Sequence, residues 1–150
     1  MANSKYEKYI VTELKTPADF TQEYNERYAT YAKRILWLDE NVVEGAFQFN
    51  CSWYMAPAEI MSESHIHDTN EVVGFFGNDP QDRYNLGGEI EFWLEDEKFN
   101  LTKSCLIFIP KGMKHSPLKI LHVERPIFHF SGLLSGQYIK NSIPRIQSEE

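Results

Sequence analysis

Short runs of β-branched and aromatic residues follow one another along most of the chain, and turn-forming residues separate them. In several runs apolar and polar residues alternate, as where Phe47 and Phe49 alternate with Gln48 and Asn50. Alternation with a period of two indicates strands that have one buried face and one wetter face. Many short strands at such spacing predict a mainly all-β fold, either an antiparallel sandwich or a barrel. The expected strands are 34–38, 46–55, 59–67, 72–76, 89–94, 105–109, 120–123 and 127–133.

One segment near the front of the chain has the period of a helix instead. Thr16 can cap a helix that has Pro17 at its first position, and Asp19 places an acid in the first turn. Large side chains then recur every three or four residues, as in one stripe of an amphipathic helix. The stripe consists of Phe20, Tyr24, Tyr28, Tyr31 and Ile35. We expect this stripe to pack the helix against the rest of the domain, and the alternative is an aromatic box for a cofactor.

The chain of 150 residues has the usual size of one domain, and no repeat or linker divides it. Its apolar fraction of 42% excludes an intrinsically disordered chain. We expect a single domain with three parts. Residues 1–40 form an N-terminal extension with a helix and a strand, about residues 45–135 form the barrel, and residues 136–150 form a polar tail.

The charge balance and the cysteine count restrict the partners and the compartment. The net charge is −7 and there is no basic run, which argues against nucleic-acid binding. The longest apolar stretch, 105–109, is far shorter than the ~20 residues of a membrane helix, and the polar start does not resemble a signal peptide. Cys51 and Cys105 are too few for a disulfide framework or a zinc–cysteine cluster. We therefore expect a cytoplasmic protein with free thiols and no nucleic-acid or membrane partner.

The histidines carry the pattern with the clearest chemistry. His65 and His67 lie two positions apart at the end of an expected strand, so both imidazoles project from the same face. Glu71 follows four residues later, and the turn formers between them can bring its carboxylate back. Downstream, a strand-like run ends in a proline, after which Gly112 permits a reversal that lets His115 point back under the sheet. Such ligands suit Fe(II), Mn(II), Ni(II), Co(II) or Zn(II), although a histidine pair alone is also typical of polar strand residues that face solvent.

The two spacings together resemble the two motifs of the cupin superfamily: H-x-H-x-x-x-E at residues 65–71 and P-x-G-x-x-H at residues 110–115. The resemblance covers about residues 45–135. It implies a double-stranded β-helix, which is a jelly-roll barrel with one divalent metal in its mouth. The implied ligands are His65, His67, Glu71 and His115. Departures from the usual family pattern remove none of these ligands.

The ligand set favours a metal-dependent enzyme that acts on a small organic molecule. Iron would imply a dioxygenase-like activity, whereas zinc, manganese or nickel would imply Lewis-acid chemistry of the cyclase, isomerase, decarboxylase or lyase type. The ligands do not choose between these reactions. The alternative is a non-catalytic barrel that binds a small ligand as a sensor or carrier. Few basic residues lie on the expected strands, which argues against a phosphorylated sugar as substrate.

Four further residues and the oligomeric state complete these expectations. If its strand face lines the cavity, His129 acts as a general base or orients the substrate. Trp53, Tyr54 and Phe75 are candidates for a hydrophobic substrate pocket around the metal, whereas the default position of strand aromatics is the core. In cupins, extensions like residues 1–40 often pack on a second subunit. We therefore expect a homodimer.

Overall fold

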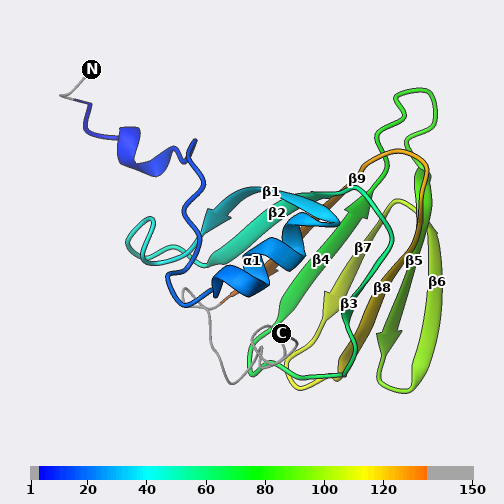
Figure 1. Ribbon diagram of the computed structural model, residues 1–150. Coiled ribbons are helices and arrows are strands. Elements are labelled where there is room, and N and C mark those ends of the chain that lie inside the picture. Colours follow the sequence, from blue (N-terminus) through cyan, green and yellow to red (C-terminus); the bar gives the residue numbers. More distant parts are fainter. Residues whose placement is uncertain (1–3, 135–150) are drawn as a thin grey trace.

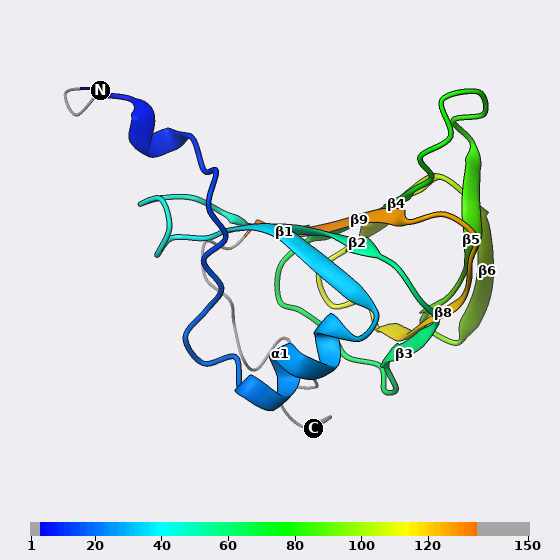
Figure 2. The ribbon, with the colours of Figure 1, turned by 45° about the horizontal axis from the view of Figure 1, so that its top comes forward.

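Two antiparallel sheets face each other in the computed structural model, which describes residues 4–134 (Figures 1 and 2). The strands of this part of the chain are β1 (Ala32–Leu38), β2 (Gln48–Tyr54), β3 (Ala58–Met61), β4 (Glu71–Phe76), β5 (Asn85–Leu94), β6 (Glu97–Lys103), β7 (Cys105–Ile109), β8 (His115–Val123) and β9 (Ile127–Leu133). One sheet has the order β1-β2-β9-β4-β7, and the other has the order β3-β8-β5-β6. The predicted mainly all-β jelly-roll architecture is therefore confirmed.

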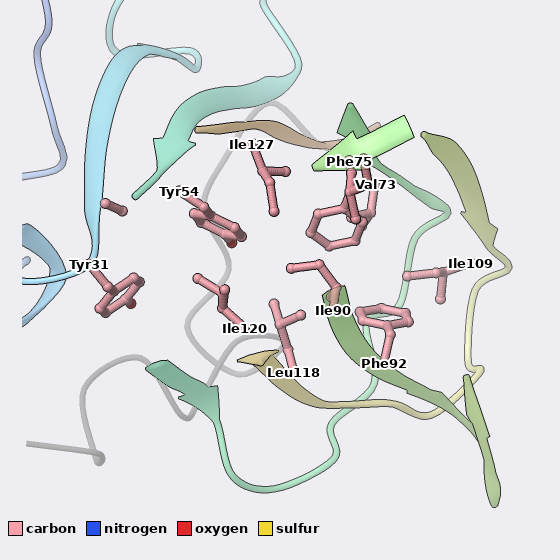
Figure 3. Packing of buried hydrophobic residues seen from close by; sticks show 12 residues of the cluster. Tyr31, Tyr54, Val73, Phe75, Ile90, Phe92, Ile109, Leu118, Ile120 and Ile127 are labelled. Carbon is pink, nitrogen blue, oxygen red and sulfur yellow. The ribbon is translucent and has the colours of Figure 1, made fainter. Parts of the chain in front are cut away.

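The hydrophobic core lies between the two sheets (Figure 3). Phe75 from β4 and Ile127 from β9 enter it from the five-stranded sheet, and both are completely buried. Ile90 and Phe92 from β5 and Ile120 from β8 enter it from the four-stranded sheet. Because side chains alternate along a strand, Phe76 and Phe128, which follow Phe75 and Ile127 in sequence, point out of the barrel.

The strand β2 is unusual because most of its inward-facing side chains are polar. Its inward positions are polar except for the last: Gln48, Asn50 and Ser52 are buried with Tyr54. Its outward positions, starting with Phe49, are all apolar. The strand β9, which pairs with β2, repeats this arrangement, because its inward face includes a histidine and a serine while its outward face has two phenylalanines. The barrel therefore has a partly polar interior and an apolar outer surface on these strands.

The helix α1 (Gln22–Ala29) starts five residues later than the sequence pattern predicts. Its cap is Thr21, whose side-chain oxygen accepts a hydrogen bond of 3.0 Å from the Tyr24 backbone N–H. The predicted cap, Thr16, is wrong, because Pro17 lies in a turn that is closed by the Phe20 N–H and the Pro17 carbonyl at 3.2 Å. A 3-10 helix, η1 (Glu7–Tyr9), precedes this turn. Among residues 4–134, no helix has the length and apolarity that a membrane span requires.

Three further differences concern strands. The strand β6 is absent from the prediction because Glu97 and Lys98 look like turn residues; it lies at the sheet edge, where most of its side chains are exposed. The strand β3 ends at Met61, so the two motif histidines do not lie on a strand. The strand β1 comes from the predicted extension and pairs with β2, so this segment forms part of the barrel wall. The division of the chain into a single domain with three parts stays a prediction, and the predicted tail, residues 136–150, lies outside the described residues.

Candidate metal centre

Backbone hydrogen bonds, rather than a shared strand, bring the two histidine motifs together. His65 forms an isolated antiparallel bridge with His115, in which each N–H donates to the other's carbonyl at 3.1 Å. The His67 carbonyl accepts a bond of 3.0 Å from the Gly112 N–H. Gly112 has a φ of +84°, which a residue without a Cβ adopts at little cost, so the turn before β8 can reverse as the sequence predicts.

The carboxylate of Glu71 reaches the same place from β4. Glu71 is the first residue of that strand and pairs with Ile109 on β7 and Leu133 on β9. The turn before it is attached to the second motif, because the Asn70 side-chain oxygen accepts a hydrogen bond of 2.8 Å from the Lys111 N–H. The chain therefore bends between the motif histidines and Glu71, as the turn formers predict.

The three imidazoles and the carboxylate converge with the spacing of ligands that share one ion. Each of His65, His67 and His115 offers a nitrogen within 4.8 Å of the others. Glu71 Oε1 lies 3.2 Å from Nε2 of both His67 and His115. Ligand atoms held about 2.1 Å from a metal at right angles are about 3 Å apart. Glu71 Oε1 is buried but accepts no well-aligned hydrogen bond from the described residues. The cluster therefore fits a metal site.

The protonation states of these groups also suit metal ligands, which must be a neutral imidazole or a carboxylate. Burial and the neighbouring His115 and His67 lower the pKa of His65 to about 3. Burial tends to raise the pKa of Glu71, but the contacts with His115 and His67 outweigh it and lower the pKa to about 2. At neutral pH the structure therefore has a neutral His65 and an ionised Glu71.

His129 lies deep in the same cavity, on β9. Its ring packs against the rings of both Tyr54 and Phe75, with centroid distances of 4.7 Å and 4.9 Å. Its Nδ1–H donates to the Gly74 carbonyl at 3.1 Å, which leaves Nε2 as a hydrogen-bond acceptor in the neutral ring. Burial lowers the pKa of His129 to about 4, so the ring is neutral at physiological pH. The face of β9 that carries His129 does line the cavity.

The structure separates the three aromatic residues that are predicted to form a substrate pocket. Tyr54 lines the cavity. Phe75 lies in the core beside it and contacts His129 and Phe92. Trp53 does not line this cavity, because neighbouring residues of a strand point to opposite faces; it packs against Phe128 on the outer surface.

The whole cavity has a volume of about 140 Å³ and extends from the histidines to the helix α1. Sequence reasoning missed the polar part of its lining. Arg34 from β1 lines the cavity together with Asn50 from β2 and Tyr24 and Tyr28 from α1. The period-two pattern of β2 could have identified Asn50, provided that the polar face of the strand, and not the apolar one, was placed inward. The stripe of α1 marks the two tyrosines, but no local pattern marks Arg34.

The comparisons with known proteins bear on the fold. No protein-family model matches the chain, and no curated protein matches it. An oxalate oxidase in complex with the substrate analogue glycolate superposes with a TM-score of 0.54 and 11% identity, over 91% of this chain and 64% of that chain. The chain thus spans less than two thirds of that enzyme.

Two further solved structures are similar to a smaller extent. KdgF from Halomonas sp. matches with a TM-score of 0.43 and 16% identity, over 71% of this chain and 78% of that chain. The cupin domain of Schizosaccharomyces pombe Cnp3 matches with a TM-score of 0.44 and 17% identity, over 61% of this chain and 55% of that chain. The superposition on oxalate oxidase, together with the two facing antiparallel sheets, shows that the chain has the same jelly-roll fold as that enzyme.

Proposed function

We propose that the chain binds one divalent metal ion through His65, His67, Glu71 and His115. One observation carries this proposal: three imidazoles and a buried carboxylate oxygen without a well-aligned hydrogen bond converge in one cavity. Leaving buried polar atoms without a partner costs free energy, and a cation at their centre would remove that cost. The donor set of imidazoles and a carboxylate suits Fe, Mn, Ni, Co or Zn.

We further propose that the protein is an enzyme that acts on a small organic molecule. A bound iron ion would support dioxygenase-type oxygenation, whereas zinc, manganese or nickel would supply a Lewis acid for cyclase, isomerase, decarboxylase or lyase chemistry. Tyr54 and Phe92 make part of the cavity wall apolar and so limit access of water. His129, whose Nε2 is an acceptor, orients a substrate hydroxyl or amine or takes up its proton.

Elemental analysis of protein purified without a histidine tag tests the metal site. We expect about one ion per chain in the wild type and almost none in His65→Ala and His115→Ala, because each substitution removes a ligand. His122→Ala is the matched control: its imidazole is 60% exposed and lies 3.7 Å from Glu124, away from the cluster. It should keep the metal. A wild type that takes up no metal would contradict the proposal and would leave the non-catalytic ligand-binding barrel.

We also propose that two copies of the chain form a homodimer through the outer face of the five-stranded sheet. This outer face is defined by the outward residues of four of the five strands, β2, β4, β7 and β9, and none of them is charged: Phe49, Cys51 and Trp53; Val72, Gly74 and Phe76; Leu106 and Phe108; Phe128, Phe130 and Gly132. On the fifth strand, β1, the exposed Lys33 lies opposite Trp53 at the edge of this face. Leu106 and Phe108 are 64% and 61% exposed. A second copy is the occupant we favour, because this apolar face is complementary to itself and sets no like charges against each other at the contact.

Light scattering tests the dimer. We expect twice the chain mass of 17.6 kDa for the wild type and the monomer mass for Phe108→Glu, because a buried unpaired charge disrupts an apolar interface. Phe99→Glu is the control: Phe99 is 36% exposed but lies on β6, in the other sheet. It should stay dimeric. A wild-type mass near 17.6 kDa would exclude the dimer.

A cytoplasmic location is also part of the proposal. It is supported by Cys51 and Cys105, which are both free thiols and half-buried, as is typical of proteins from reducing compartments.

A further inference from the structure

The guanidinium of Arg34 lies among neutral partners at the end of the cavity near α1. It donates one hydrogen bond of 2.9 Å to the Asn50 side-chain oxygen and one of 3.2 Å to the Tyr24 hydroxyl. Its carbon lies 4.2 Å from the centre of the Tyr28 ring, with Trp37 at 5.3 Å and Phe20 at 5.5 Å. Burial raises the pKa of Tyr24, so that hydroxyl is a neutral acceptor and not a counter-ion.

No carboxylate of the described part of the chain pairs with this guanidinium. An arginine has five N–H donors and stays charged in proteins. Two of those donors bond to neutral oxygens, so Arg34 brings a charge and spare donors into the cavity. A half-buried cation without an anion is costly, and an incoming anion would stabilise it.

The fold places Arg34 and the metal cluster on the same inner surface. Arg34 pairs in register with Ser52 on β2, and Ser52 pairs with His129 on β9. Two residues further along the same strands, Asn50 on β2 pairs with Ser131 on β9, and the Asn50 side-chain amide donates a hydrogen bond of 3.1 Å to the Ser131 hydroxyl. From β1 to β4, which carries Glu71, there are three strand spacings, or roughly 14 Å at the backbone. Both side chains line the one cavity, so a single small molecule can face both.

The charges of the cavity favour an anionic occupant. Apart from the histidines, Arg34 and Glu71 are the only ionisable acidic or basic side chains among the described residues that line it. A divalent cation held by Glu71 would leave a charge of about +1 at one end, and Arg34 adds another at the opposite end. The cavity volume of about 140 Å³ is small, which suits a small acid.

We infer that Arg34 is the carboxylate anchor of the cavity, and that the substrate is a small organic acid whose polar far end faces the histidine cluster. The contact between the polar end of the substrate and the histidine cluster rests on the proposed function, whereas binding of the carboxylate depends on Arg34 alone. A carboxylate matches the planar fork of a guanidinium and accepts two parallel hydrogen bonds from it.

Calorimetric titration tests the anchor with defined probes. The acids are glycolate, 3-hydroxypropionate and 4-hydroxybutyrate, each compared with its primary amide, and inorganic phosphate is a further anion. We expect at least one acid to bind zinc-loaded wild type more tightly than its amide. Arg34→Gln should weaken that acid by about 10- to 100-fold and leave the amide nearly unchanged, because only the acid forms charge-assisted bonds.

A second variant covers the case in which Arg34→Gln does not fold. Asn50→Asp keeps the shape of the side chain but sets a carboxylate 2.9 Å from the guanidinium, where it neutralises Arg34 internally. The affinity for the acid should then fall to that of the amide. Acids that bind no better than amides, acids that bind equally to all variants, or binding of phosphate alone would each overturn the inference.

The same titrations on metal-free protein separate this inference from the proposed function. If acids bind in an Arg34-dependent way although the wild type takes up no metal, the anchor stands and the metalloenzyme proposal fails. If the wild type holds about one metal per chain but shows no preference for acids, the metal site stands and the anchor fails.

Discussion

Phe75→Ala is expected to lower the free energy of unfolding by about 3–5 kcal/mol, the usual cost of removing a buried phenylalanine ring. Phe75 is completely buried and lies between the two sheets (Figure 3). Its ring stacks on His129 at 4.9 Å and meets the ring of Phe92 at 6.2 Å. The loss is a large share of the 5–15 kcal/mol of a typical domain, and urea unfolding of wild type and variant measures it.

Leu121→Ala is the control for this change. Leu121 lies on β8, outside the proposed dimer interface, and its side chain is 41% exposed. Its removal should change the free energy of unfolding by no more than about 1 kcal/mol. If Phe75→Ala proves too unstable to purify, Phe75→Leu should show a smaller loss of about 1–2 kcal/mol. Equal effects at Phe75 and Leu121 would contradict the described core.

The second large effect is a loss of stability in acid that depends on His129. Burial lowers the pKa of His129 from 6.5 to about 4 in the folded chain. The unfolded chain therefore binds a proton at a higher pH than the folded chain does, so stability is complete above about pH 6.5 and falls as the pH drops toward 4. Over the whole window this amounts to about 3 kcal/mol, and between pH 7 and pH 5 to about 2 kcal/mol.

Denaturant unfolding of metal-free protein at several pH values measures this dependence. In His129→Gln the side chain does not titrate, so the variant should lose about 2 kcal/mol less than the wild type between pH 7 and pH 5. His65, whose pKa is also lowered, titrates in both proteins and therefore cancels in the comparison. Identical pH dependence in the two proteins would show that the imidazole of His129 is not buried.

Local patterns were sufficient to predict a mainly all-β fold, and the resemblance of the two motifs to those of cupins predicted the jelly-roll barrel and the histidine cluster. Alternation and turn residues mark most strands, because the backbone pleat and the φ preferences of glycine and proline act over only a few residues. Both motifs also depend on short-range geometry: Gly112 reverses the chain before His115, and the turn before Glu71 returns its carboxylate. Helix α1 was predicted with the wrong cap, because Thr16 and Thr21 both precede residues suited to a first turn and only the finished hydrogen bonds distinguish them.

The sequence by itself thus determined that the chain forms short strands and carries two histidine motifs that resemble those of cupins. Only the tertiary structure decided which face of each strand points inward. A period of two shows that the faces of β2 differ, but burial depends on what lies opposite, and here polar Asn50 faces the cavity while Trp53 faces outward. Likewise, only the tertiary structure shows that Arg34 faces the cavity. Its neutral partners come from β2 and α1, so the lack of a carboxylate partner among residues 4–134 cannot be inferred from its neighbours in sequence.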